Sequence, residues 1–336
     1  MLVRPVREAD IAALEALASG ATADVHTLPK SRDAIERAVQ RSLASFAARV
    51  DIPSDEAYTF VLEDGQGSLI GSAALSATAG ANGTFFAFRN DVMQQVSRDL
   101  NISHSVHALT LCSGLTGHSQ LSSFYVSGDM PQAAALLSRS RLMFAALAPH
   151  RFGDRFFASL AGITDASGES PFWEALGRKF FKMDFLKAEC LIEGGRNRSL
   201  IVELMPHYPV YVPLLPGAAQ AAMGQVHAEG ELPLQILSDE GFEPDEFIDI
   251  FDGGPILQAH KHALRAFSGS LRRRVTTSCS AAIKVSYLVA TIDEDNFCVT
   301  LAEAAALETS DSIGLSPEVI ARLNVATGAA VSCVRV

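Results

Sequence analysis

The chain has 336 residues, of which 48% are hydrophobic and 19% charged, and its formal net charge is −11. This length predicts two domains, or one domain with an appendage, and the apolar content argues against a disordered chain. The negative charge argues against a general nucleic-acid-binding protein. Because no apolar run reaches about eighteen residues and the first ten residues lack an apolar signal segment, we expect no membrane span and no secretion signal.

The five cysteines are scattered along the chain, are odd in number and form no Cys-x-x-Cys pair. We therefore expect reduced thiols of a cytoplasmic protein, with neither a disulfide framework nor a zinc site. The histidines show no HExxH or paired Cys/His spacing, so we expect no metal. The cysteines are Cys112, Cys190, Cys279, Cys298 and Cys333.

The first part of the chain predicts a strand, two helices and a hairpin. A short strand, LVRPV, precedes a helical apolar period that ends near residue 19, and the same period returns over 30–49. Two β-rich runs within 58–75 flank the turn EDGQG, which is the composition of a β-hairpin.

Residues 106–126 predict two more strands around a turn rich in Gly, Ser and Thr. A helix over 132–147 follows, with Pro131 at its start and Asp129 available as a cap.

The rest of the chain predicts shorter elements. We expect a strand, a loop and a helix opened by Ser170-Pro171 within 156–181, and a strand over 199–204. Helices over about 218–225 and up to Gly241, then a strand over 246–251, complete this part. This order predicts a mixed α/β sheet rather than a doubly wound parallel one. We divide the chain into 1–267, with a core of 1–184 and an extension of 185–267, and a small β-rich module of 268–336.

Several strings resemble known enzymes. VRPVREADIAALEAL, FVLEDGQGSLIGSAAL and PFWEALG are similar to landmarks of the GCN5-related N-acetyltransferase fold. Longer strings resemble the arginine N-succinyltransferase family, in particular its alpha-subunit type: HALTLCSGLTGHSQLSSFYV, GESPFWEALGRKFF, VELMPHYPVYVPLLPGAAQAAMGQVH and FIDIFDGGPIL. The resemblance implies a largely antiparallel sheet flanked by helices, with a small C-terminal module like a β-barrel.

The resemblance also implies a reaction and its participants. The family transfers a succinyl group from succinyl-CoA, a co-substrate rather than a bound cofactor, to the α-amino group of L-arginine or, in some members, ornithine. We expect a homo-oligomer, or a heteromer with a paralogous beta subunit. A different possibility is a non-catalytic partner subunit that binds arginine or stabilises a catalytic paralogue.

His227 is the expected proton donor, because it ends the string Met-Gly-Gln-Val-His that carries this role in the family. An unperturbed imidazole titrates near neutral pH, which suits proton transfer. From the sequence pattern alone, a surface or capping histidine is the more common case. The chain departs from many family members in having Ala228 instead of proline after the histidine.

Three residues are expected to contact succinyl-CoA. Phe124 matches a family contact, and the backbone near Phe124 and Val126 would bind the thioester if this strand splays from its neighbour, although both side chains could belong to the core. Gln132 begins the segment that corresponds to an Arg/Gln-x-x-Gly-x-Gly/Ala loop, but here alanines replace the glycines. A helix N-terminus can still bind phosphate, so we expect weakened or shared CoA binding.

Carboxylates are expected near the guanidinium of arginine, since the two groups pair bidentately. Asp249 and Asp252 flank a Gly-Gly-Pro turn and are the candidates, although Asp252 could equally cap that turn. Arg89 could bind a substrate carboxylate or pair on the surface. Arg139 and Arg141 could face CoA phosphates or solvent.

Overall fold

The computed structural model describes residues 1–20, 31–81, 83–185, 187–188, 198–277 and 284–336. Its strands join into one continuous sheet of fifteen strands among these residues, in the order β14-β11-β15-β12-β13-β1-β2-β3-β6-β7-β10-β9-β4-β5-β8. The strands are β1 (Leu2–Pro5), β2 (Ala57–Glu63), β3 (Leu69–Ser76), β4 (Ala87–Ser97), β5 (Ile102–Cys112), β6 (Ser119–Val126), β7 (Arg155–Ser159), β8 (Val210–Tyr211), β9 (Glu243–Ile248), β10 (Pro255–His260), β11 (Leu271–Thr276), β12 (Val285–Thr291), β13 (Val299–Ala304), β14 (Ser312–Gly314) and β15 (Ala330–Arg335).

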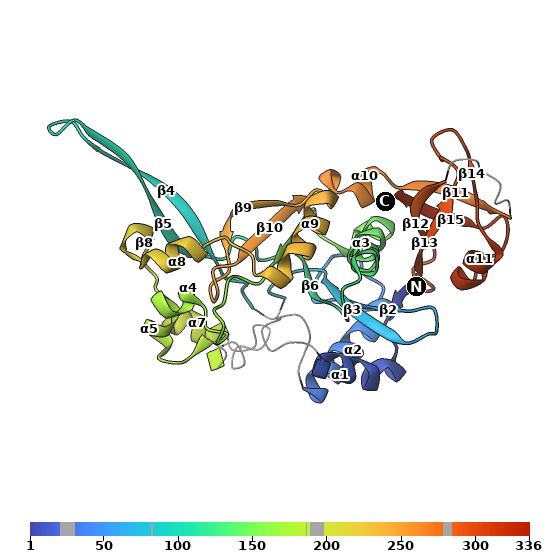
Figure 1. Cartoon of the computed structure of the whole chain (residues 1–336), viewed down its shortest axis with the longest axis horizontal. Helices are drawn as coiled ribbons and strands as arrows, with labels where there is room; N and C mark the ends of the chain where they lie inside the picture. Colours follow the sequence, from blue (N-terminus) through green and yellow to red (C-terminus); the bar gives the residue numbers. More distant parts are fainter. Residues whose placement is uncertain (21–30, 82, 186, 189–197, 278–283) are drawn as a thin grey trace.

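Helices lie on both sides of this sheet (Figure 1). They are α1 (Ile11–Gly20), α2 (Arg32–Ala47), α3 (Pro131–Leu147), α4 (Pro171–Ala175), α5 (Gly177–Phe181), α7 (Arg198–Leu204), α8 (Gly217–Ala222), α9 (Glu231–Glu240), α10 (Arg265–Ser268) and α11 (Pro317–Leu323). Short 3₁₀ turns include η4 (Val212–Leu214), η5 (Ala228–Gly230) and η6 (Lys261–Ala263).

The sheet is largely antiparallel, as expected. Among the described pairings, only β6 with β7 and β11 with β14 are parallel. Strand β2 shows why helices are needed on both faces, because Phe60 packs toward α3 in the main core whereas Val61 packs toward α1 and α2. Alternate residues of a strand point to opposite faces, so a strand buried on both faces becomes a continuous apolar run.

The C-terminal strands continue the same sheet. Strand β13 pairs with β1 at Val299 and Val3, and Leu288 of β12 packs in the main core. A second cluster around Val275, Tyr287 and Leu323 forms a small core of its own. Because β13 and β14, the ends of this five-stranded run, are not paired with each other in the described residues, closure into a barrel stays a prediction. The division at residue 267 likewise stays a prediction.

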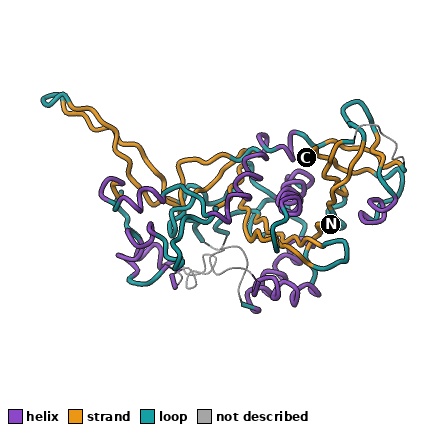
Figure 2. The backbone as a smooth tube through the Cα atoms, viewed as in Figure 1, coloured by secondary structure: helices purple, strands orange, loops and turns teal. Residues whose placement is uncertain are grey.

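One sequence expectation about elements was wrong, and one strand was missed. Residues 199–204 form part of helix α7, not a strand, because Ile201 and Met205 are buried at helical spacing in the cluster around Trp173. Strand β4 had no counterpart in the prediction. It pairs with β5 over its whole length, from Ala87–Cys112 to Ser97–Ile102, and the two strands project far from the body of the molecule (Figures 1 and 2).

The lone tryptophan and its neighbours form a further core beside this hairpin. Trp173 is fully buried, and its indole Nε1 donates to the Met183 carbonyl at 3.0 Å. Helix α4 begins as expected, with the Ser170 hydroxyl accepting from the Trp173 amide at 3.2 Å. In the described part of the chain, no helix is long and apolar enough to cross a membrane.

Candidate active site

Strand β6 separates from β7 half-way along its length. The parallel pairing covers Ser119–Leu121 against Phe156–Ala158 and ends there, whereas β6 continues to Val126 along β3. The β3 register shifts between Ser72 and Ala74, and Ser123 has φ of 50°, so a bulge coincides with the separation. Beyond Leu121, no strand among the described residues pairs with the edge of β6 that faced β7.

The side chains of Phe124 and Val126 are partly buried and apolar. Both pack against the main hydrophobic core, and the Arg141 guanidinium carbon lies 5.3 Å from the Phe124 ring centroid. The core interpretation of these side chains therefore applies, and a contact with an acyl group would have to come from the backbone of this segment.

Helix α3 starts at the end of β6 and carries the segment without glycines. Its N-cap is Met130, and no side chain caps it, so the expectation that Asp129 is the cap was wrong. Gln132 is exposed, whereas Ala133 is fully buried. The alanine methyl thus belongs to the core, while the first amides of the helix have no acceptor within the helix and are oriented toward its N-terminal side.

The two arginines of α3 face neither solvent nor an open phosphate site. Arg139 pairs with Glu240 of α9 at 3.4 Å, inside the fold. Arg141 is buried and donates to three carbonyls, those of Ala74, Ser122 and Ser138, at 3.3 Å each. Burial lowers the pKa of Arg141 to about 9. The expectation for both side chains was wrong, because they serve packing between α3, the sheet and α9.

His227 lies at the end of β7. Its amide donates to the Ala161 carbonyl at 2.8 Å, and Val226 forms a β-bridge with Gly162. The side chain is half-buried, and its Nδ1 accepts from the Glu229 amide at 3.3 Å as the N-cap of η5. The capping interpretation is therefore correct as far as Nδ1 is concerned, and it leaves Nε2 as the nitrogen that can carry and donate a proton.

Asp252 holds the loop beside His227. Its carboxylate is buried and accepts from the amides of Gly162 at 2.7 Å and Gly254 at 2.8 Å. The Gly224 amide donates to the Gly253 carbonyl at 2.8 Å, which ties the histidine segment to the same turn. A Cβ on Gly162 would lie 2.7 Å from the Asp252 carbonyl oxygen, so this close approach of the backbones requires glycine.

Asp249 begins that turn, where its amide donates to the Gly254 carbonyl at 2.9 Å, and Arg89 lies on the neighbouring strand β4. Asp249 directly follows β9, is half-buried, and accepts from the Phe251 amide at 2.7 Å. Arg89 is on β4, opposite Phe247 of β9, and pairs with Asp91 at 2.7 Å. Arg89 thus has a carboxylate partner on its own strand, which agrees with the surface-pair alternative.

The strand directions bring these segments to one end of the sheet. Strand β6 is parallel to β7, so its last residues and the Ala161 segment extend in the same direction. Strand β10 is antiparallel to β7, with Ile256 opposite Ser159, so the turn that holds Asp249 and Asp252 lies at this same end. Phe124, His227 and Asp249 come from distant parts of the sequence, and the topology places them around the opening between β6 and β7.

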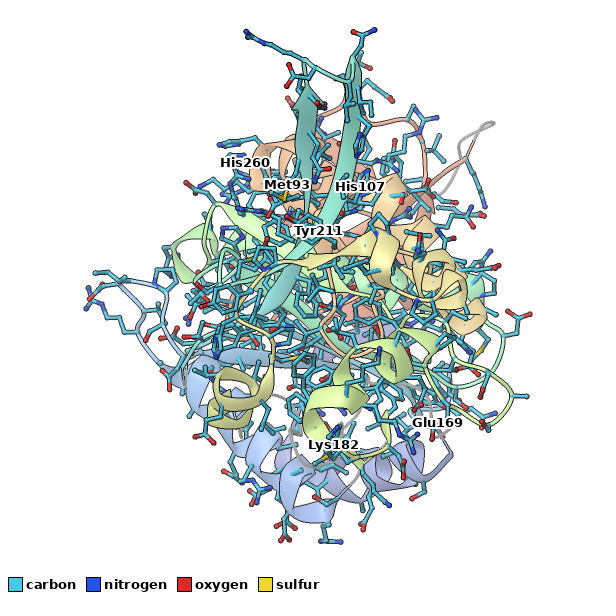
Figure 3. All side chains as sticks on the ribbon, turned by 90° about the vertical axis from the view of Figure 1, so that its left-hand side faces the viewer. Met93, His107, Glu169, Lys182, Tyr211 and His260 are labelled. Carbon is cyan, nitrogen blue, oxygen red and sulfur yellow. The ribbon has the colours of Figure 1, made fainter. Side chains whose placement is uncertain are left out.

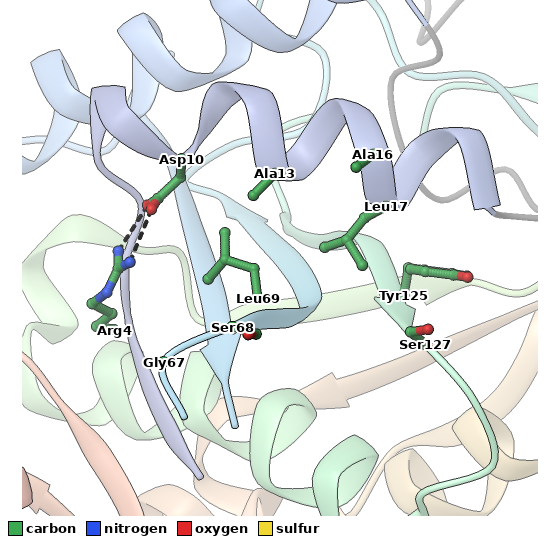
Figure 4. Close-up of a pocket in the computed structure, with 10 residues that line it drawn as sticks. All are labelled: Arg4, Asp10, Ala13, Ala16, Leu17, Gly67, Ser68, Leu69, Tyr125 and Ser127. Carbon is green, nitrogen blue, oxygen red and sulfur yellow. Dashed lines mark hydrogen bonds and ion pairs between the residues drawn. The ribbon is translucent and has the colours of Figure 1, made fainter. Parts of the chain in front are cut away.

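A groove of about 530 Å³ lies against the end of β6, on the side of helix α1 (Figure 4). Tyr125 and Ser127, on either side of Val126, line it, together with the buried ion pair of Arg4 and Asp10 at 2.7 Å. None of the seven candidate residues lines it, but it meets the same stretch of β6. Ser123, Tyr125 and Gly162 could not be predicted from the sequence pattern, because tertiary pairing determines the bulge and the close backbone approach.

Comparisons with known proteins identify the family of the chain. The family model described as arginine N-succinyltransferase beta subunit matches residues 1–266, and the model of its C-terminal domain matches residues 272–335. The chain belongs to the arginine N-succinyltransferase family. The sequence prediction of the family is thereby confirmed, and the family is one of acyltransferase enzymes.

Two relatives from Pseudomonas aeruginosa are similar over most of the chain. "Arginine N-succinyltransferase subunit alpha" is 45% identical and covers 80% of this chain and 80% of its own length. "Arginine N-succinyltransferase subunit beta" is 34% identical, covering 99% of this chain and 98% of its own length. A solved structure of "arginine/ornithine succinyltransferase subunit AI" from the same species is 39% identical, with a TM-score of 0.90, and covers 99% of this chain and 98% of that chain.

Proposed function

We propose that this chain transfers the succinyl group of succinyl-CoA to the α-amino group of L-arginine. The observation that carries the proposal is the opening between β6 and β7, with the His227 segment fixed at the end of β7. The relatives from P. aeruginosa are named succinyltransferases whether they are called alpha or beta, which favours a catalytic chain over a non-catalytic partner.

The thioester would lie along the free edge of β6. The amine attacks the thioester carbonyl carbon, a C–N bond forms, and the carbonyl oxygen becomes an oxyanion. An amide of the Phe124–Val126 segment would donate to that oxyanion, and such a donor contributes about 3 kcal/mol in enzymes that use one. The CoA pyrophosphate would lie at the first turn of α3 near Gln132, where helix amides and the helix dipole favour an anion.

Collapse of the intermediate breaks the C–S bond and releases the CoA thiolate. His227 would protonate this thiolate from Nε2, because Nδ1 is occupied by the Glu229 amide. The attacking amine must lose one proton for the amide to form, so the proton count of the reaction balances with one proton released by the amine and one taken up by the sulfur.

The guanidinium of the substrate requires an acidic group. Asp249 is the better candidate of the two aspartates, because it is half-buried at the rim of the turn whereas Asp252 is buried and holds the amides of Gly162 and Gly254. Asp252 would then act by positioning the loop beside His227. Arg89 pairs with Asp91, so we do not assign it to the substrate carboxylate and place it at the edge of the site.

We further propose that the enzyme is an oligomer, either of this chain alone or with a paralogous beta subunit, since relatives carry subunit names. We place it in the cytoplasm. The described cysteines, Cys112, Cys298 and Cys333, are free thiols, which is usual in a reducing compartment.

The decisive experiment measures thiol release by the purified chain with succinyl-CoA and L-arginine, and in parallel with ornithine. We expect turnover, and we expect His227→Ala to lower kcat by about 100- to 10,000-fold, the usual contribution of a general acid. An unchanged kcat in this variant would contradict the role of His227. No turnover by the chain alone, with turnover after a paralogous chain is added, would contradict a self-sufficient enzyme.

His260→Ala is the matched control. His260 is the N-cap of η6, and its Nδ1 accepts from the His262 amide at 3.3 Å, which is the local geometry of His227. It lies opposite Arg155 at the start of β7, and therefore at the other end of the sheet. We expect this variant to keep the kcat of the unmodified chain.

A further inference from the structure

Arg141 is the most deeply buried arginine among the described residues, and it forms no ion pair with any of them. Charged side chains normally extend to solvent, as Lys182 does on the face shown in Figure 3. Three other described arginines are buried, and each has a carboxylate partner: Arg4 with Asp10, Arg139 with Glu240 and Arg151 with Glu294. A buried charge without a partner is costly, so packing alone does not explain why a cation occupies position 141.

The Arg141 guanidinium lies where the regular pairing of β3 and β6 is interrupted. Its Nη1 donates to the carbonyls of Ala74 on β3 and Ser122 on β6, at 3.3 Å each. The register of the two strands shifts at this point, and Ser123 has φ of 50°. The other donors go to Ser138 of the same helix, Nε to its carbonyl at 3.3 Å and Nη2 to its hydroxyl at 3.0 Å. Arg141 thus supplies hydrogen bonds at the bulge of β6, where the ladder lacks its regular partners.

The peptide that joins Ser122 to Ser123 has one side toward Arg141 and the other toward the opening between β6 and β7. Because one nitrogen contacts the carbonyls of both Ala74 and Ser122, the Ser122 carbonyl lies in the seam between β3 and β6. A trans peptide holds its C=O and N–H on opposite sides. The Ser123 amide therefore points away from the guanidinium, toward the edge of β6 that no described strand pairs with beyond Leu121.

A positive charge on one side of this peptide strengthens the donor on its other side. Hydrogen bonds in series polarise one another inside a protein, so donation to the Ser122 carbonyl makes the Ser123 N–H a better donor. The charge would also act directly on a negative oxygen bound to that amide, since no described carboxylate pairs with Arg141. Burial lowers the pKa of Arg141 to about 9, so the guanidinium is still protonated at neutral pH.

We propose that Arg141 is a positioning residue whose positive charge, acting through the Ser122–Ser123 peptide, stabilises the oxyanion formed from the thioester. This inference rests on the proposed function, and it adds the Ser123 amide as a donor beside those of the Phe124–Val126 segment. The charge is in place before the reaction begins. It therefore favours the oxyanion of the transition state over the neutral carbonyl of the bound thioester.

Three variants separate the charge of Arg141 from its hydrogen bonds. Arg141→Lys keeps the charge, Arg141→Gln keeps a donor without the charge, and Arg141→Met keeps neither. Because the charge acts on the transition state, Arg141→Gln and Arg141→Met should lower kcat by about 10- to 100-fold and change KM for succinyl-CoA by less than about threefold. Arg141→Lys should keep kcat within about fivefold of the unmodified chain.

The infrared stretch of the thioester carbonyl reports the same polarisation without turnover. The probe is succinyl-CoA with a carbon-isotope label at that carbonyl, bound in the absence of an amino-acid substrate. Arg141→Gln and Arg141→Met should move the bound carbonyl stretch to a higher wavenumber, whereas Arg141→Lys should leave it where it is in the unmodified chain. A merely structural role would not follow the charge across these variants.

Arg139→Gln is the matched control, because Arg139 is buried in the same helix but pairs with Glu240. It should keep both the kcat and the carbonyl stretch of the unmodified chain. Circular dichroism should show which variants keep the fold; if Arg141→Met does not fold, the comparison of Arg141→Lys with Arg141→Gln decides.

Equal losses of kcat in Arg141→Lys and Arg141→Gln would overturn the role of the charge. Unchanged kcat and an unchanged carbonyl stretch in all folded Arg141 variants would overturn the inference and leave the proposed function intact. No thiol release by the unmodified chain, alone or with a paralogous chain, would contradict the proposed function, and the inference would fail with it.

Discussion

The two hairpins of this protein, β2–β3 and β4–β5, have the same topology and opposite surroundings. Tyr58, Phe60, Val61 and Leu75 of the first are fully buried between helices on both faces. In the outer part of the second, every residue from Val92 to Val96 is exposed. Both hairpins are paired by the same antiparallel backbone hydrogen bonds. They differ in whether helices cover their side chains.

This difference in burial explains why the sequence pattern predicts the β2–β3 hairpin but not the β4–β5 hairpin. A strand that is buried on both faces needs a nearly continuous apolar sequence. The run YTFVLE has this composition, so the sequence pattern predicts a strand there. The outer part of the β4–β5 hairpin, residues 91–106, needs only a sequence compatible with pairing, and DVMQQVSRDLNISHSV has no clear alternation of polar and apolar residues. We therefore expect mutations in the first hairpin to lower the free energy of unfolding much more than mutations in the outer part of the second.

The largest expected effect is on the core of the first hairpin. The Phe60 ring lies 5.5 Å from the Phe144 ring and 5.8 Å from the Phe297 ring, measured between centroids. Phe60→Ala should therefore lower the free energy of unfolding by about 3–5 kcal/mol, since it removes a buried ring and leaves a cavity. Urea denaturation followed by circular dichroism measures this change.

Val92→Ala on β4 is the matching variant of the second hairpin, to be compared with Phe60→Ala. Val92 is 56% exposed, so the change in unfolding free energy should stay within about 0.5 kcal/mol, measured on dilute, monomeric protein. Equal losses in the two variants would contradict the contrast between the hairpins.

The contrast between buried and exposed interactions can also be tested with two ion pairs, one buried and one more exposed. Asp10 pairs with Arg4 at 2.7 Å, and both side chains are at most 9% exposed. At neutral pH, Asp10→Asn should lower the free energy of unfolding by about 1–3 kcal/mol, because Arg4 loses a buried partner but keeps Glu63. Asp91→Asn, which removes the half-exposed partner of Arg89, should cost less than about 1 kcal/mol.

The pH dependence of the Asp10 effect follows from its pKa. Burial raises the pKa of Asp10, but the hydrogen bonds from Arg4 and from the Arg7 amide outweigh burial and hold it below the ordinary value of 3.8. The ionised carboxylate therefore stabilises the fold above pH 3.8, and this contribution is lost as the pH falls through the lowered pKa. The difference between the unmodified chain and Asp10→Asn should narrow in acid; a constant difference would contradict the assignment.

The smallest effect concerns two residues with positive φ. Ser123 in the bulge of β6 has φ of 50°, and Asn101 in the turn between β4 and β5 has φ of 52°. Asparagine tolerates this conformation better than serine does. Ser123→Gly should raise the free energy of unfolding by about 0.5 kcal/mol, and Asn101→Gly should change it less. The order of the two changes, measured by thermal unfolding, tests whether the bulge holds strain.

The sequence predicted the parts of the fold that local patterns determine. The two N-terminal helices, the β2–β3 hairpin, the Ser170 cap and the mixed sheet follow from periodicity and turn chemistry. The strand predicted at 199–204 was wrong, since an apolar run of this length is compatible with helix or strand until Ile201 and Met205 are placed against the Trp173 cluster.

The candidate site was predictable only through the family resemblance. A histidine in a Gly/Gln/Ala segment carries no chemical signal of its own, and its position depends on a bridge between Val226 and Gly162. The burial of Arg139 and Arg141 depends on α9 and on the bulge of β6, which lie far away in the sequence. Long-range contacts of this kind leave no local pattern.

The central claim is that the free edge of β6 binds the acyl-CoA thioester. Hydrogen exchange followed by mass spectrometry, with and without a non-hydrolysable succinyl-CoA analogue, tests it most directly. Exchange should become slower in peptides covering residues 122–126 and the first turn of α3, and should stay unchanged in the buried strand β2. Unchanged exchange over 122–126 under saturating ligand, with protection elsewhere, would contradict it.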